Sequence, residues 1–310
     1  MAQIMKSAVS RFFYPSWLLL TVLGSYAMIV SGFAEATTVI LFFFASCGVI
    51  LALEWWMPFK REWVKPQKDI KTDIAHFFLS AGVTVSLIRA LLYIPLFMLA
   101  SYVSSIIPFA LWPAKWPLLI QFVLVVILVD FFTYWVHRFM HTVDFLWRIH
   151  SVHHSVSRLY SFNSVRVHPF ETILFYVAQT APMVLLGAPV ELMAMFTCFI
   201  GVTSLLQHCN IDIRYGVFNS IFSTSDLHRW HHSKIVKEAL NYGDNLIIWD
   251  IVFGSYYLPD RNGPAELGIG GAIREYPQNY IGQILAPFTW KRLAYSNNDT
   301  ARPKVSGEHD

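Results

Sequence analysis

The chain has 310 residues, of which 55% are hydrophobic and only 14% are charged, and its mean hydropathy is +0.46. A soluble domain carries about 25% charged residues, so this composition is typical of a polytopic membrane protein. The formal net charge of +3 is too small to indicate a nucleic-acid partner. The three cysteines form no C-x-x-C pair, which excludes a zinc knuckle and an iron–sulfur motif.

Apolar runs along the chain predict membrane-spanning helices. A bilayer core about 30 Å thick requires about 20 apolar residues in a helix. The last two runs are short and are joined by Gly187-Ala188-Pro189, so they also fit a hairpin that only dips into the bilayer. We expect an all-α membrane protein with about four to six transmembrane or re-entrant helices. The runs cover residues 17–33, 37–53, 74–100, 116–136, 172–186 and 190–206.

Lysine and arginine in the loops predict the orientation of the chain. Basic residues are frequent in 55–73 and in 137–170, whereas 34–36 has none and 101–115 has only Lys115. The positive-inside rule then places both termini and the histidine-rich segments on the cytoplasmic side. The chain ends Ser-Gly-Glu-His-Asp, which is no ER-retrieval signal. We therefore expect the bacterial inner membrane, or the ER membrane if the protein is eukaryotic.

These features predict three regions. Residues 1–136 form the N-terminal transmembrane helices. Residues 137–260 form a histidine-rich catalytic region that includes a helical hairpin at 172–207 and a cytoplasmic helical cap. Residues 261–310 form an interfacial segment and a flexible tail, in which 276–293 mixes aromatic side chains with Lys291 and Arg292, and 296–310 is expected to be disordered.

Histidines are concentrated in one part of the chain. Ten of the twelve fall between His137 and His232, and eight of these form three boxes. Because residues three and four apart share a face of an α-helix, each box predicts a set of imidazoles directed to one side. The boxes read His137-Arg-Phe-Met-His141, His150-Ser-Val-His153-His154 and His228-Arg-Trp-His231-His232.

The number of histidines favours two metal ions. Imidazole suits zinc, copper, iron and nickel, but a catalytic zinc uses about three protein ligands. Eight imidazoles, with His208 as a ninth candidate, therefore indicate two metals. Asp130, Tyr134, His137 and His141 follow one helical stripe, so Asp130 is expected to orient a box-one imidazole through its other ring nitrogen.

With these motifs the chain resembles the fatty acid hydroxylase/sterol desaturase superfamily of membrane di-iron oxygenases. The resemblance covers residues 120–258, and strings around the boxes support it. Some members carry a second histidine four residues after the position of His208, where this chain has Asp212. The supporting strings are Asp130-Phe-Phe-Thr-Tyr134-Trp-Val-His137-Arg138, Leu146-Trp147-Arg148, Asn241-Tyr-Gly243 and Trp249-Asp250-Ile-Val-Phe-Gly254.

The resemblance implies a centre of two iron ions that uses O2 and external electrons on a C–H bond of a lipid. The lipid would be a fatty acyl lipid, a sterol, an alkyl glycerol ether or an aminolipid, and we favour hydroxylation over desaturation. The electrons would come from a separate cytochrome, ferredoxin or reductase. His168, followed by Pro169, either binds metal or lines the pocket. The implied ligands are His137, His141, His150, His153, His154, His208, His228, His231 and His232.

Two other classes of function remain open from the sequence. A membrane metallohydrolase is disfavoured because the chain lacks H-E-x-x-H and no glutamate lies within a box. A non-enzymatic metal carrier is expected to place polar ligands in the middle of its spans, whereas these histidines lie at span ends. Metal content and O2 consumption would separate the three alternatives.

Overall fold

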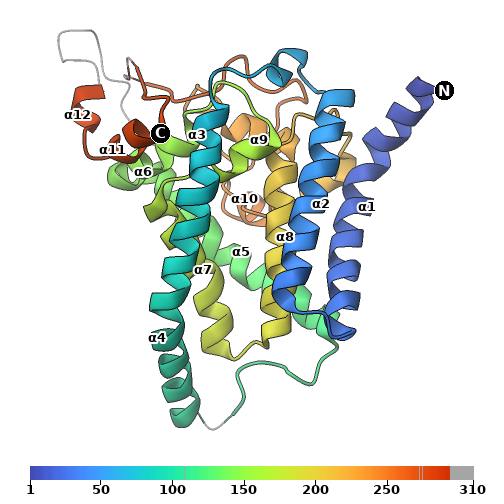
Figure 1. Ribbon diagram of the computed structural model, residues 1–310, viewed down its shortest axis with the longest axis vertical. Coiled ribbons are helices and arrows are strands. Elements are labelled where there is room, and N and C mark those ends of the chain that lie inside the picture. The colour runs from blue at the N-terminus through green and yellow to red at the C-terminus, as the bar shows by residue number, and fades with distance from the viewer. Residues whose placement is uncertain (108, 272, 274, 294–310) are drawn as a thin grey trace.

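The computed structural model describes residues 1–107, 109–271, 273 and 275–293, and the regular elements of these residues are helices without a strand. The long helices form one bundle, and the short helices gather at one end of it, where the N-terminus also lies (Figure 1). The prediction of an all-α protein is confirmed. The long helices are α1 (Ala2–Val30), α2 (Glu35–Trp56), α4 (Thr84–Ile106), α5 (Leu118–Thr142), α7 (Pro169–Leu186) and α8 (Val190–His208).

The short elements make a cap over the bundle. Two of them, α3 and η2, precede α4 without a break and give one continuous helix from Ile70 to Ile106. The cap is therefore joined to the third membrane segment by a continuous helix rather than by a loop. The short elements are η1 (Arg61–Val64), α3 (Ile70–Ala75), η2 (His76–Val83), α6 (Asp144–His154), η3 (Ser161–Val165), η4 (Gly216–Ser220), α9 (Ser225–His231), α10 (Ile248–Val252), α11 (Tyr280–Leu285) and α12 (Trp290–Leu293).

By length and composition, six helical segments within the described residues can cross a membrane. Each corresponds to one of the apolar runs in the sequence. Large apolar side chains such as Leu41, Leu91 and Phe97 are exposed on the outside of the bundle. Such a surface requires a lipid environment, because soluble proteins rarely expose contiguous apolar patches of this extent.

The observed helices extend beyond the apolar runs. The first helix starts at Ala2, although Lys6 and Arg11 kept this stretch out of the predicted span. The third segment likewise starts at Ile70 and ends at Ile106. Polar residues lower the hydropathy of a helix end without breaking its backbone hydrogen bonds, so the apolar run marks only the part inside the bilayer.

Helix α8 lies at the centre of the bundle and is the most buried of the six segments. It packs against α1, α2 and α5, while α7 packs against α4 and α5. The turn between α7 and α8 places Gly187 at a φ of 78°, a conformation that glycine adopts without strain, and Pro189 then precedes α8. This tight connection directs α8 back through the bundle so that it ends at His208, beneath the cap.

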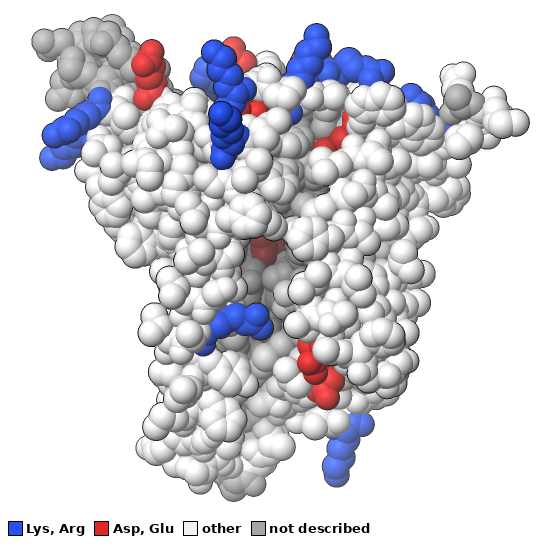
Figure 2. Space-filling view, in the orientation of Figure 1, with Lys and Arg blue, Asp and Glu red and all other residues white. Residues whose placement is uncertain are grey.

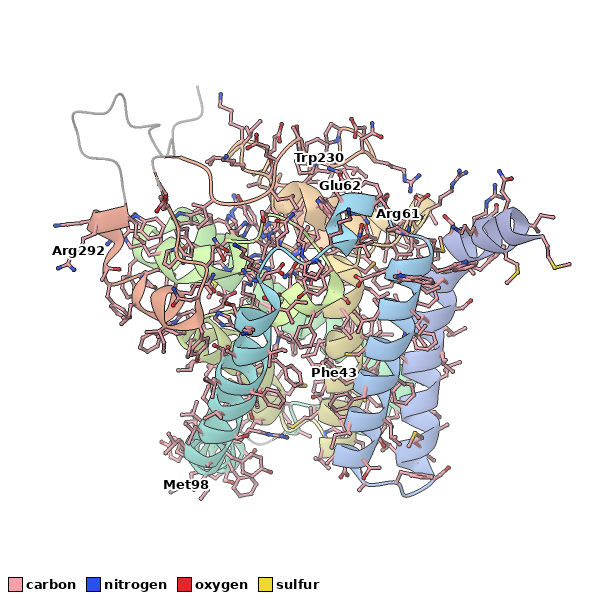
Figure 3. The ribbon with its side chains drawn as sticks, turned by 45° about the horizontal axis from the view of Figure 1, so that its top comes forward. Phe43, Arg61, Glu62, Met98, Trp230 and Arg292 are labelled. Carbon is pink, nitrogen blue, oxygen red and sulfur yellow. The ribbon has the colours of Figure 1, made fainter. Side chains whose placement is uncertain are left out.

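The C-terminal segment lies at the cap end. Helix α11 packs against α3, and the Nε2 atom of His76 lies 2.8 Å from Oε1 of Gln283. Figure 3 shows Arg61 and Arg292 at this end and Met98 at the opposite end of α4. The expected flexible tail at 296–310 lies outside the described residues. The division into three regions stays a prediction.

Candidate metal centre

Nine histidines from five parts of the chain meet at the junction of the bundle and the cap. Helices α5, α6 and α9 carry the three boxes, His208 is the last residue of α8, and His232 directly follows α9. The structure sorts the nine into two groups in which the candidate ligand nitrogens lie within 4.8 Å of one another. The first group contains His137, His141, His150, His154 and His231; the second contains His153, His208, His228 and His232.

Boxes two and three are each divided between the two groups. His150 and His154 belong to the first group, and His153 between them belongs to the second. Box three shows the reverse pattern, because His231 alone joins the first group. Adjacent residues in an α-helix point about 100° apart, so each His-His pair spans two neighbouring sites. The expectation that all histidines of one box point to the same side is therefore corrected for boxes two and three.

The nitrogen positions match the ligand shell of a metal. In the first group the Nε2 atom of His154 lies 3.2 Å from that of His150 and 3.1 Å from that of His231. In the second group the Nε2 atom of His208 lies 3.0 Å from that of His228. Two nitrogens bound at right angles to one ion at about 2.1 Å are separated by about 3.0 Å.

Hydrogen bonds at the opposite ring nitrogens direct these lone pairs inward. The Nδ1 atoms of His137 and His231 lie 2.8 Å from the carbonyl oxygens of Tyr242 and Leu240, respectively. A carbonyl only accepts, so each Nδ1 donates and each Nε2 carries a lone pair. Lone pairs that face one another at about 3 Å repel unless a cation lies between them. The residues therefore fit a pair of metal ions.

Two other imidazoles are oriented in the same way. The Nδ1 atom of His150 donates to Oε1 of Glu171 at 2.8 Å, and that of His208 donates to the carbonyl of Ser204 at 2.9 Å. Nε2 of His141 is buried without a hydrogen-bond partner among the described residues. Burial also lowers the pKa of the box-two and box-three imidazoles, which keeps them neutral and able to bind metal. These are His150, His153, His154, His228, His231 and His232.

Asp130 does not contact an imidazole, contrary to expectation. Its carboxylate accepts hydrogen bonds from the backbone N–H groups of Asn245 at 2.6 Å and Leu246 at 3.2 Å. The side-chain amide of Asn245 donates to the same carboxylate at 3.1 Å. His137, about two turns further along α5, has the carbonyl of Tyr242 as the partner of its Nδ1 instead. Asp130 thus anchors the loop that supplies that carbonyl.

His168 lies outside both groups, and both of its ring nitrogens are used elsewhere. Its Nδ1 accepts a hydrogen bond from the backbone of Phe170, and its Nε2 lies 3.1 Å from the carbonyl oxygen of Ile284. It caps the N-terminus of α7, with Pro169 in the first helical position. The structure therefore does not support its place among the metal ligands.

Two carboxylates of the site escaped the sequence analysis. Asp250 accepts backbone hydrogen bonds from Tyr242 and Gly243, both at 2.7 Å, and so fixes the turn beside His137. A Cβ at Gly243 would clash with the carbonyl oxygen of Leu246 and would also lie 2.9 Å from Oδ2 of Asp250, which explains the glycine. Glu171, the partner of His150, looks in the sequence like an ordinary acidic residue in the first turn of a helix. Its only signal is its place two residues after the His168-Pro169 pair.

A cavity of about 280 Å³ leads from the apolar part of the bundle to the histidines. On the face shown in Figure 2, a hollow opens between α4 and α2, with acidic atoms inside it. Its outer wall includes Phe43, Ala81 and Val85. Figure 3 shows Phe43 on the side of α2 that faces the middle of the bundle. Five ligand histidines form part of its inner wall, namely His137, His150, His153, His208 and His228.

Known proteins share these features. Residues 122–255 match the family model described as fatty acid hydroxylase. An ornithine lipid hydroxylase of Rhizobium tropici is 34% identical over 308 residues, which is 92% of this chain and 86% of the relative. The chain belongs to the fatty acid hydroxylase/sterol desaturase superfamily. The resemblance of the box motifs to this superfamily is confirmed.

More distant relatives match a smaller part of the chain. A sphinganine C4-monooxygenase of Arabidopsis thaliana is 25% identical over 44% of this chain and 54% of its own length. An alkylglycerol monooxygenase of Danio rerio is 29% identical over 59% of this chain and 39% of its own length. No solved structure matches the chain.

Proposed function

We propose that the protein is a membrane-bound di-iron hydroxylase that acts on a C–H bond of an amino-acid-bearing lipid. The observation that carries the proposal is that two groups of inward-facing imidazoles border a cavity reached from the apolar part of the bundle. The names of the relatives support a lipid substrate. The ornithine lipid hydroxylase matches nearly the whole chain and therefore supports an amino-acid-bearing lipid in particular.

The two groups support two ions of iron. They offer five and four imidazoles. Zinc prefers about four ligands, whereas iron accepts about six and leaves positions free in both groups. Bound iron would supply the activation of O2 and the cleavage of the C–H bond, with oxygen entering the lipid as a hydroxyl group. This outcome agrees with the hydroxylase and monooxygenase names of the relatives.

The residues of the chain orient the ligands and shield the site. Carbonyls at 240 and 242 hold the rings of His231 and His137, which fixes the direction of both Nε2 lone pairs. Glu171 accepts from His150 and raises the basicity of that ligand. Apolar side chains such as Phe43 line the entrance and exclude water from the reacting C–H bond.

The distribution of charge supports a cytoplasmic metal centre. Lysine and arginine side chains on the face shown in Figure 2 are concentrated at the cap end. The positive-inside rule assigns this end to the cytoplasm, and the Rhizobium relative supports a bacterial inner membrane. A separate cytochrome, ferredoxin or reductase would then deliver electrons to the cap.

Metal analysis and isotope labelling test the proposal. The purified protein should contain about two iron ions per chain, and membranes supplied with 18O2 and a reductase should yield lipid with one labelled oxygen. One zinc ion per chain with hydrolytic activity would favour a metallohydrolase. Reversible metal exchange without turnover would favour a carrier, and loss of two hydrogens without label would indicate a desaturase.

A further inference from the structure

The cavity beside the metal centre has one apolar end and one acidic end. Phe43, Ala81 and Val85 line the end that lies among the spans, and Asp244 and Glu171 line the inner part. Its volume of about 280 Å³ is at the lower limit of ordinary ligand sites, which measure about 300–1,000 Å³. The cavity therefore has room for a head group but not for the acyl chains of a lipid.

Glu171 lines this cavity and has one carboxyl oxygen without a partner in the described part of the chain. Its Oε1 accepts from His150, but its Oε2 is buried without a hydrogen-bond partner among the described residues. Only 2% of Glu171 is exposed. A buried carboxylate oxygen without a donor costs about 1–3 kcal/mol or more, so a ligand that donates a hydrogen bond would relieve this cost.

Asp244 adds a second acidic side chain to the lining of the cavity. Its carboxylate accepts from the side-chain amide of Asn245 at 3.3 Å and interacts with that of Gln179. Burial raises the pKa of Asp244 only to about 6, so the group is charged at neutral pH. Ion pairs among the described residues join neither Asp244 nor Glu171 to a lysine or an arginine.

We propose that Asp244, with Glu171 beside it, binds an ammonium group in the head of the lipid substrate. This inference rests on the proposed function and names the chemical class of its substrate. A primary ammonium donates three hydrogen bonds and pairs with the negative charge of Asp244. The head group is then fixed next to His150 and His208, so the oxidised C–H bond belongs to the head group or its immediate neighbour rather than to an acyl tail.

The competing role for Asp244 and Glu171 is to balance the positive charge of the bound metal ions. Neither Asp244 nor Glu171 belongs to the two groups of candidate ligand atoms. The two roles differ in what Asp244→Asn changes. A residue that binds the ammonium affects recognition of the lipid, whereas a residue that balances the metal affects metal content.

The kinetic test uses the full-length, metal-loaded protein in lipid nanodiscs. The probes are ornithine lipid and the same lipid with its free amine acetylated. Wild type should prefer the free amine at least about tenfold in kcat/KM. Asp244→Asn should raise KM for the free amine at least about tenfold, change kcat less, abolish the preference and leave iron content unchanged. Asp212→Asn, a surface carboxylate that faces Arg261, is the matched control and should behave like wild type.

The fold around Asp244 is expected to survive this substitution, because Gln207 donates to its backbone oxygen rather than to its carboxylate. Native mass spectrometry of the metal-free protein with both lipids gives a second readout. Selective binding of the amine by wild type but not by Asp244→Asn supports the inference even if no lipid is hydroxylated. Equal binding of both lipids, or loss of iron in Asp244→Asn, would overturn it. Turnover of a neutral lipid alone would refute the ammonium and leave the hydroxylase intact.

Discussion

The Nε2 atoms of His154 and His231 lie 3.1 Å apart, although 77 positions separate the two residues in the sequence. Each is flanked by a histidine that belongs to the other group, His153 and His232 respectively. The two groups therefore share both helices, α6 and α9. A shift of either helix would displace ligands at both sites at once, so the two metal ions are expected to bind cooperatively.

Removal of one imidazole should empty at least one site. His208→Ala leaves three ligands in the second group, and we expect iron content to fall by half or more and turnover to fall at least about 100-fold. Elemental analysis and an activity assay measure both effects. The control is His168→Ala, which removes a helix cap and should retain the metal while losing about 1 kcal/mol of stability. Normal iron content in His208→Ala would exclude His208 as a ligand.

Asp130→Ala should weaken the site through the 242–247 loop. The substitution leaves three buried N–H donors without their acceptor, two of them on Asn245. We expect activity to fall by about 10–100-fold, with a lower thermal midpoint. Turnover and thermal unfolding in the same detergent check this. Wild-type values for both would show that Asp130 does not support the loop.

Asp73→Ala should destabilise the connection between α3 and η3. Its carboxylate accepts from Arg166 at 2.5 Å, Tyr160 at 2.5 Å and Asn163 at 3.2 Å. Loss of the partner of a buried arginine costs about 3–5 kcal/mol, which chemical denaturation can measure. Asp144 is exposed and pairs with the half-buried Arg148, so Asp144→Ala should change stability by less than about 1 kcal/mol. Equal effects of the two variants would contradict this account.

Acid should destabilise the metal-free protein. Burial holds the pKa of the box-two and box-three imidazoles well below the ordinary value of about 6.5. Between those pKa values and 6.5 the unfolded chain binds more protons than the folded chain, so stability decreases as the pH falls through this window. Thermal unfolding of chelated protein at pH 8 and pH 5.5 should show a lower midpoint at pH 5.5. An unchanged midpoint would show that these imidazoles are not buried in their neutral form.

The membrane-spanning segments and the candidate ligand histidines could be predicted from the sequence because both have local patterns. Apolar runs marked the membrane segments, and spacings of three and four residues marked the boxes. The contacts that Asp130 and His168 make could not be predicted from the sequence, because they involve residues 245–246 and 284, more than 100 positions away. Helical spacing predicted the face on which Asp130 lies, but it contained no information on the loop that occupies that face. Glu171 was missed because its partner, His150, lies 21 positions away in a different helix, so helical spacing does not relate the two residues.

The order of the ligands along the chain constrains how the protein is made. The first ligand, His137, ends the fourth membrane segment, His208 ends the sixth, and three further ligands follow between 228 and 232. Neither group is complete until all six segments have been synthesised and inserted. Metal is therefore expected to enter after membrane insertion, into a chain whose inward-facing lone pairs still repel one another. The inserted chain should be less stable before it binds metal than after, so metal binding would complete the fold.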